Sequence, residues 1–184
     1  MGAPPPGDSA LAFLIPSGPR RQIDQWRRLY DPYYGLIPPH ITIAYPPFVP
    51  EVDWPALRPA LKECLRAFQP FDVALRELGT FPGEPGVLWL KPEDGENLER
   101  IHAGLMQRFA SHFPASTLEY VPHLTLGFFD SPDALARAQQ AVASNLRPMR
   151  FTLRRLAYAV LGENNVWRLC DQLALGVRYR RTTE

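Results

Sequence analysis

Two similar stretches, PPHITIAYPP at residues 38–47 and VPHLTLGFFD at residues 121–130, decide the fold of this chain. Each places a histidine after a proline and continues with an apolar residue, a threonine and a second apolar residue, so both follow the pattern H-h-T-h, in which h is apolar. Because side chains alternate between the two faces of a strand, each stretch predicts a strand with an imidazole and a hydroxyl on one face and a buried reverse side. His40 and Thr42 form the first such pair, and His123 and Thr125 form the second.

The same alternation assigns the residues that follow each threonine. Ala44 and Gly127 would share the outward face with the histidines, where their small size leaves room for a phosphate. Tyr45 and Phe128 would lie on the buried face together with the other apolar residues of each strand.

Composition permits a packed core beneath these strands. With 184 residues, 46% of them hydrophobic and 21% charged, the chain has the profile of one soluble globular domain. No stretch approaches the length of a membrane helix, and the proline-rich start lacks the basic and apolar parts of a secretory signal. We expect a disordered leader at residues 1–9, a domain at residues 10–184, no membrane partner, and a cytoplasmic monomer.

Charge is balanced overall but uneven in kind. The net charge is +1, and arginine outnumbers lysine 18 to 2. Arginines gather at residues 147–155 and 178–181, where planar guanidinium groups would suit phosphate or simply form a solvated surface. Cys64 and Cys170 have no metal-ligand spacing and are interpreted as buried free thiols.

Periodicity and turn residues predict the same order of elements twice. Helices are expected at residues 19–30, 53–68 and 98–113 and from a Ser131 cap onward, and strands at residues 10–15, 71–81, 87–91, 150–162 and 164–175 in addition to the two histidine strands. This internal duplication indicates two pseudo-symmetric lobes at about residues 10–92 and 93–175. The predicted fold is α+β, a pseudo-twofold bilobal fold in which two antiparallel sheets line a central groove and helices pack outside.

A pseudo-twofold axis would bring the two H-h-T-h faces together across that groove. The alternative, in which the copies lie on distant sheet edges, stays open at this point. If the faces meet, two histidines of ordinary pKa can supply one charged and one neutral imidazole near neutral pH. Thr42 and Thr125 can donate hydrogen bonds to phosphate oxygens, and a rate maximum is expected between about pH 6 and 8.

The paired H-h-T-h pattern and the order of elements over about residues 10–175 resemble the two-histidine phosphoesterase superfamily, which includes 2′-5′ RNA ligases and RNA 2′,3′-cyclic phosphodiesterases. The resemblance implies hydrolysis of cyclic phosphodiesters at RNA ends without metal or other cofactor, with His40 as proton donor and His123 as proton acceptor. The implied partner is RNA with a 2′,3′-cyclic phosphate end, or a small cyclic nucleotide. Where such enzymes commonly carry an arginine after the second motif, this chain has Phe128.

Other candidates are weaker. Tyr34 and Phe81 could stack on a nucleobase, whereas Trp89 is interpreted as a core residue. His102 and His112 lack a threonine partner and are interpreted as structural, and no HxH or HxxxH spacing indicates a metal site. The alternatives left open are reverse 2′-5′ ligation, another cyclic phosphodiester as substrate, and an RNA-end binding module with little turnover.

Overall fold

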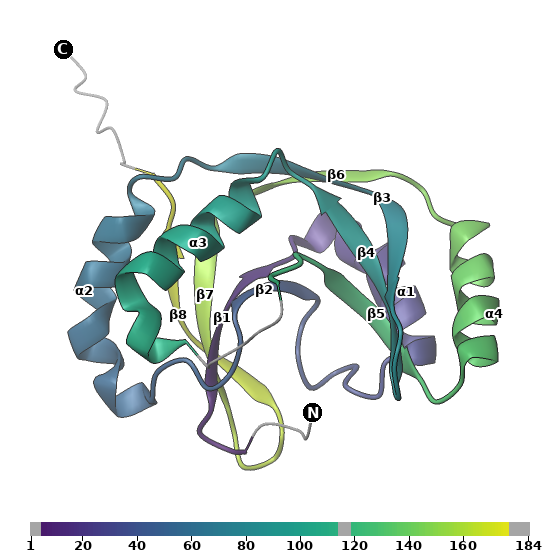
Figure 1. Ribbon diagram of the computed structural model, residues 1–184, viewed down its shortest axis with the longest axis horizontal. Helices are drawn as coiled ribbons and strands as arrows, with labels where there is room; N and C mark the ends of the chain where they lie inside the picture. Colours follow the sequence, from purple (N-terminus) through teal and green to yellow (C-terminus); the bar gives the residue numbers. More distant parts are fainter. Residues whose placement is uncertain (1–4, 114–118, 177–184) are drawn as a thin grey trace.

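The computed structural model describes residues 5–113 and 119–176 of the chain. Within these ranges the chain forms four α-helices and two antiparallel four-stranded sheets (Figure 1), which confirms the predicted α+β fold. The first sheet has the strand order β2-β1-β7-β8, with β1 at Ser9–Leu14, β2 at His40–Ala44, β7 at Arg155–Leu161 and β8 at Trp167–Ala174. The second has the order β5-β4-β3-β6, with β3 at Phe71–Phe81, β4 at Gly86–Glu93, β5 at Leu124–Phe129 and β6 at Met149–Leu153.

The two histidine strands hold equivalent places, because β2 and β5 are outer strands of their sheets. Each sheet takes two strands from each half of the sequence, so the chain crosses between sheets. One crossing divides the strand predicted at residues 150–162. The chain passes at Arg154 from β6 to β7, and the strict alternation of β6, with odd-numbered residues buried, ends there because β7 is buried on both faces.

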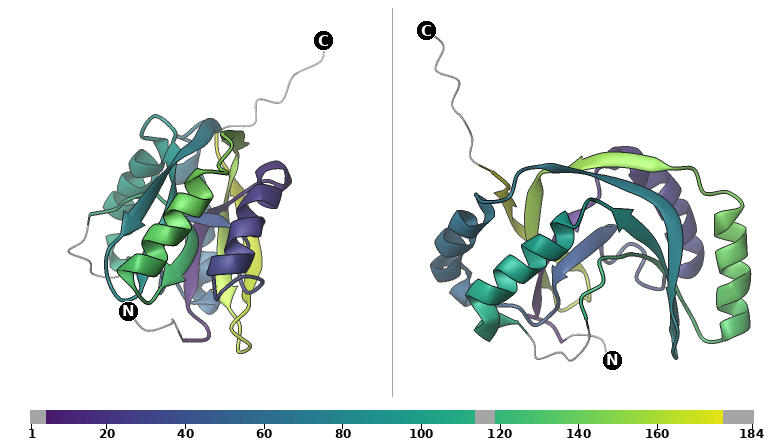
Figure 2. Two further views of the ribbon diagram at one scale, coloured as in Figure 1. Left: turned by 90° about the vertical axis from the view of Figure 1, so that its right-hand side faces the viewer. Right: turned by 45° about the horizontal axis from the view of Figure 1, so that its top comes forward.

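The helices lie on two sides of the molecule. α1 (Ser17–Tyr30) and α4 (Pro132–Ala143) contact the second sheet, and α2 (Trp54–Leu65) and α3 (Asn97–Phe109) contact the first (Figures 1 and 2). The predicted cap of α4 is confirmed, since Ser131 Oγ accepts a hydrogen bond from the Ala134 N–H at 3.3 Å. The helical spacing of Ile23, Trp26, Leu29 and Tyr30 predicts one buried stripe on α1, and this prediction is wrong at one position. Leu29 is 71% exposed, and Arg27 is buried instead.

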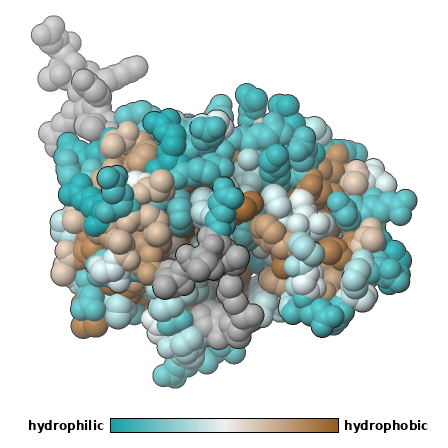
Figure 3. Space-filling view, viewed as in Figure 1, coloured by the Kyte–Doolittle hydropathy of each residue, from teal (hydrophilic) through white to brown (hydrophobic). Residues whose placement is uncertain are grey.

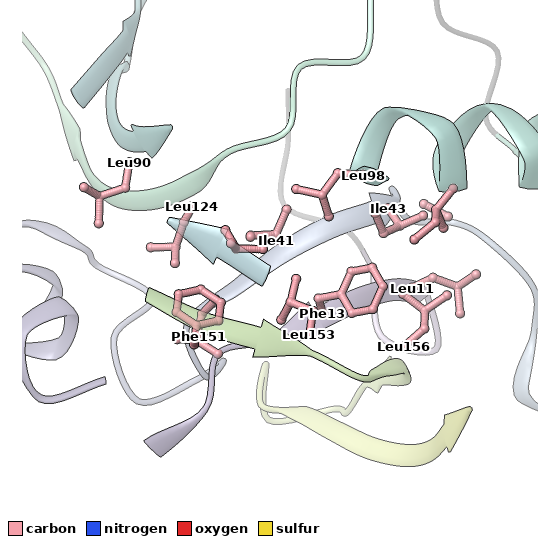
Figure 4. Close-up of a cluster of buried hydrophobic side chains, with 14 of the residues drawn as sticks. Leu11, Phe13, Ile41, Ile43, Leu90, Leu98, Leu124, Phe151, Leu153 and Leu156 are labelled. Atoms are coloured by element: carbon pink, nitrogen blue, oxygen red, sulfur yellow. The ribbon is translucent and has the colours of Figure 1, made fainter. Parts of the chain in front are cut away.

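The core continues from one sheet to the other. Ile41 of β2 and Leu124 of β5, the residues directly after the two histidines, are completely buried in the same hydrophobic cluster (Figure 4). Phe13 from β1 and Leu90 from β4, each in the strand beside a histidine strand, belong to that cluster as well. Burying a large aliphatic side chain stabilises the fold by about 1.5–3 kcal/mol. The buried residues of β2 and β5 therefore hold both histidine strands against the core.

The predictions for the start of the chain, the arginine-rich segments and the two cysteines can be compared with the structure. Residues 5–8 precede β1, and the N–H of Gly7 donates to the carbonyl of Leu161 at 2.8 Å, while residues 1–4 and the arginines of residues 178–181 lie outside the described residues. The arginines of residues 147–155 are exposed, and the surface over β3 and β6 at the top of Figure 3 is mainly hydrophilic. Cys64 and Cys170 are free thiols, but both are only half-buried. In the described ranges, no helix combines the length and apolar character needed to cross a membrane.

Candidate active site

Two histidines stand at the beginning of the strands that meet in the middle of the molecule. His40 is the first residue of β2, and His123 directly precedes β5. These outer strands of different sheets contact each other. The alternative of distant sheet edges does not describe this fold.

Both imidazoles are held in the same way. The Nδ1 of His40 lies 2.8 Å from the carbonyl oxygen of Pro38, and the Nδ1 of His123 lies 2.8 Å from that of Val121. A carbonyl oxygen can only accept, so each Nδ1 carries a hydrogen and each neutral ring has its lone pair on Nε2. A proline precedes each histidine, and a proline keeps the residue before itself extended. In the two copies that residue is Pro38 or Val121, whose carbonyl oxygen accepts the hydrogen bond from the imidazole. Nε2 is therefore the atom available for proton transfer in both rings.

Both histidine strands contain a β-bulge at the same position of the H-h-T-h pattern. The pairing of β2 with β1 skips Ile43, and the pairing of β5 with β4 skips Leu126. In each copy the bulged residue is the second apolar residue of the pattern. A bulge inserts one unpaired residue and so reverses the alternation of side chains beyond it.

This reversal corrects the sequence-based assignment of four residues. Ala44 and Gly127 are buried among the core residues, so they do not leave room for a phosphate. Tyr45 is 40% exposed, and Phe128 is half-exposed on the face that carries Thr125. The expectation was wrong because strict alternation holds only where the strand pairs without an extra residue.

Gly127 has a packing role. A Cβ atom at this position would overlap the Cβ and carbonyl oxygen of Tyr30 at the end of α1. The Tyr30 ring packs on Phe129 with 5.5 Å between the ring centroids. Glycine thus allows α1 to approach the backbone of β5 closely.

Aromatic rings surround the imidazole of His123. Tyr45 stacks on it with centroids 6.4 Å apart, and Phe81 meets it edge-on at 5.0 Å. Trp89 lies 6.1 Å from the imidazole and stacks on Phe81 at 4.9 Å. The Trp89 ring occupies the space that a side chain at Gly79 would fill, and Trp89 is buried as predicted. Although Tyr45 is 40% exposed as a residue, desolvation of its hydroxyl raises the pKa to about 12, so the hydroxyl stays protonated.

The environment favours neutral imidazoles. Burial lowers the pKa of His40 to about 4, against the opposing hydrogen bond to Pro38, and the charges of Arg27 and His123 lower it further. Burial also lowers the pKa of His123, again opposed by its backbone hydrogen bond. An anion bound between the rings would favour the charged form of either one.

Arg27 is a buried cation beneath the loop that leads to His40. Its Nε donates to Asp31 at 2.8 Å, and its Nη2 donates to the carbonyl oxygen of Ile37 at 3.0 Å. Asp31 is itself buried and accepts from the Tyr33 N–H. Removing either charge would leave the other buried without its partner, which is costly.

A second set of contacts fixes the backbone of β2. The Tyr120 hydroxyl donates to the carbonyl oxygen of Thr42 at 2.7 Å. The His102 ring stacks on Tyr120 with centroids 3.9 Å apart, and its Nδ1 lies 2.7 Å from the carbonyl oxygen of Ile43. Tyr120 belongs to the segment before His123, so this bond connects the two motifs. His102 has the structural contacts expected of it.

The predicted site residues fall into two groups. The half-buried residues are His40 and Thr42 of β2, Thr125 of β5, and His123 directly before β5, and Phe81 touches His123. Tyr34 instead accepts a hydrogen bond from Arg28 at 2.9 Å. Sequence reasoning missed Tyr45, Tyr120 and Arg27, and only the polar character of Arg27 within an apolar helical stripe could have drawn attention to it.

Two further observations concern the remaining candidates. His112 lies against Phe48, with ring centroids 6.2 Å apart. Among residues 5–113 and 119–176, the structure contains no group of three or more His, Cys, Asp or Glu residues that could hold a metal ion.

Comparison with known proteins gives one family. A sequence model described as "2'-5' RNA ligase superfamily" matches residues 15–165. A provisionally named phosphoesterase of Halalkalibacterium halodurans is 30% identical over 128 residues, which cover 67% of this chain and 71% of that protein. A provisionally named phosphoesterase of Bacillus cytotoxicus is 28% identical over 159 residues, covering 82% of this chain and 86% of its own length.

Solved structures share the fold. TT0787 of Thermus thermophilus superposes with a TM-score of 0.65 at 21% identity, covering 93% of this chain and 99% of that chain. Escherichia coli LigT in complex with 3'-AMP superposes with a TM-score of 0.64 at 19% identity, covering 92% of this chain and 98% of that chain.

Proposed function

Because the chain belongs to the 2′-5′ RNA ligase superfamily, we propose that it is a metal-independent phosphodiesterase that hydrolyses 2′,3′-cyclic phosphates at the ends of RNA or on nucleotides. One observation carries the proposal. Two histidines, one at the start of β2 and one directly before β5, are each held through Nδ1 by the carbonyl of the residue two positions before, which leaves Nε2 for proton transfer, and the two strands contact each other. The relatives named as phosphoesterases and the nucleotide-bound LigT structure support this class of substrate.

The proposed reaction balances with water as the only co-reactant. A neutral imidazole accepts a proton from water through Nε2 as the water oxygen bonds to phosphorus. A charged imidazole donates its Nε2 proton to the ribose oxygen whose bond to phosphorus breaks. The product is a ribose with one free hydroxyl and one phosphate monoester. By family resemblance His40 is the donor and His123 the acceptor.

The threonines would stabilise the charge that develops on phosphate. Thr42 and Thr125 belong to the same strands as the histidines, and their hydroxyls would donate to the non-bridging oxygens. The bound phosphodiester would also supply the negative charge that favours the charged form of the donor, whose pKa is lowered in the free protein. The same step with a 5′-hydroxyl in place of water would form a 2′-5′ linkage, because the 5′ oxygen bonds to phosphorus while the bond from phosphorus to the 3′ oxygen breaks and that oxygen takes the donated proton.

Turnover in the presence of chelator tests the proposal. Purified protein with excess EDTA should convert 2′,3′-cyclic nucleotides to monophosphates, and His40→Ala or His123→Ala should reduce turnover by about 10²- to 10⁴-fold. His112→Ala is the matched control, because this residue packs against Phe48, and it should keep wild-type turnover. Binding of the cyclic nucleotide without any turnover would contradict the enzyme and favour an RNA-end binding module.

A further inference from the structure

A cavity of about 660 Å³ lies between the C-terminal end of α1 and the end of β5. Its walls include Arg28, Tyr33, Pro85, Phe128 and Asp130. α1 and β5 contact each other along this side of the molecule (Figure 1). The volume is within the range of pockets that hold small ligands and is large enough for a nucleoside.

The β5 bulge connects this cavity with the catalytic face. Thr125 lies opposite Trp89 of β4, and Phe128 lies opposite Val87, so both project from the same face of the sheet. Their partners on β4 are two residues apart, so Thr125 and Phe128 are separated by about 7 Å along the strand. A phosphate held at Thr125 would therefore have its nucleoside within reach of Phe128. Without the bulge, the Phe128 ring would point into the core.

The cavity combines apolar rings with three charged residues, of which Asp31 is buried and paired with Arg27, whereas Arg28 and Asp130 are separate from each other. Tyr33 and Phe128 meet edge to face, with centroids 5.4 Å apart. Arg28 is held beside the cavity by Tyr34, through a 2.9 Å hydrogen bond to its hydroxyl and a distance of 5.3 Å to its ring centroid. In the described part of the chain, no carboxylate lies within 4.0 Å of Arg28. Asp130 is an exposed carboxylate on the same wall.

We propose that this cavity is a nucleobase subsite that prefers guanine, an inference that rests on the proposed function. RNA-binding sites typically place apolar or aromatic side chains against a base and hydrogen-bond its edges. The two oxygens of Asp130 would accept from N–H groups on two neighbouring nitrogens. Of the four RNA bases only guanine presents such a pair, at N1 and N2. Arg28 would donate to the O6 and N7 acceptors of the same base. Tyr33 and Phe128, which contact each other, would together form the apolar surface against which the base packs.

Substrate preference tests the subsite. We would measure kcat/KM for the four nucleoside 2′,3′-cyclic phosphates and for glycerol 1,2-cyclic phosphate, which has no base. Guanosine 2′,3′-cyclic phosphate should exceed the uridine substrate by about tenfold, and Asp130→Asn should remove most of that ratio. Phe128→Ala should raise KM for all four nucleotides relative to the base-free substrate. Asp133→Asn, a matched change in the exposed first turn of α4, should keep the ratio.

The outcomes separate this inference from the proposed function. Turnover of every substrate with no base preference, and no effect of Asp130→Asn, would overturn the subsite while the proposed function stands. If nothing is turned over, calorimetric binding of guanosine 2′-monophosphate and uridine 2′-monophosphate decides the matter. Tighter binding of the guanosine compound, lost in Asp130→Asn, would sustain the subsite, and equal affinity would overturn it.

Discussion

The lowered pKa of His40 predicts a specific pH dependence of folding stability. The folded protein holds this imidazole neutral down to about pH 4, whereas its ordinary pKa is 6.5. As the pH falls below 6.5, the unfolded chain gains a proton that the folded chain does not, so the free energy of unfolding decreases. The stability associated with neutral His40 is complete above pH 6.5 and is lost as the pH falls from 6.5 to about 4.

The size of the effect follows from these two pKa values. At about pH 4.5 the unfolded histidine is almost fully charged, and folded His40 is mostly neutral. The free energy of unfolding is therefore lower at pH 4.5 than at pH 7.5 by about 2.5 kcal/mol, since one pKa unit corresponds to about 1.4 kcal/mol. His40→Asn removes this titration and keeps a side-chain N–H donor for the Pro38 carbonyl. Between pH 7.5 and pH 4.5, the free energy of unfolding of this variant should therefore fall by about 2.5 kcal/mol less than that of the wild type.

Urea denaturation followed by circular dichroism at the two pH values measures this difference. Thr42→Val is the matched control, because it changes a neighbouring residue of β2 without removing a titrating group, and its pH dependence should equal that of the wild type. His123→Asn should reduce the pH dependence with the same sign, since burial lowers the pKa of His123 as well. Equal pH dependence of the wild type and His40→Asn would refute the reasoning that burial keeps His40 neutral.

Three further predictions concern activity and packing. The profile of kcat/KM against pH should be bell-shaped and indifferent to chelator. Its maximum should lie below pH 6.5 rather than between pH 6 and 8, because both histidine pKa values are lowered. A maximum above pH 7, or loss of activity with EDTA and its rescue by Mg²⁺, would contradict this prediction. The double variant His40→Ala/His123→Ala should lose much less activity than the product of the single losses, because both residues serve one step, and multiplicative losses would indicate separate steps. Gly127→Ala should destabilise the protein by about 1–3 kcal/mol in urea denaturation, because the added methyl group overlaps Tyr30, and wild-type stability would show that α1 can move away.

Local patterns in the sequence were sufficient for the catalytic candidates and for the elements, except that they did not divide residues 150–162 into β6 and β7. Apolar residues repeat at helical spacing along α3 and alternate along β3, and each pattern reports only on neighbours within one element. The repeated H-h-T-h stretch identified His40 and His123 as a pair because duplication is visible without any contact being known. Proline before each histidine likewise acts through the adjacent peptide unit.

The tertiary structure alone decided how these elements form a site. The bulges at Ile43 and Leu126 arise from pairing with neighbouring strands, so alternation within one strand could not reveal that Tyr45 and Phe128 face outward. The passage of the chain between sheets at Arg154, and the meeting of β2 with β5, depend on the packing of two layers. The pKa of an imidazole depends on burial and on charges from distant parts of the chain, because electrostatic interactions act through space and not along the sequence.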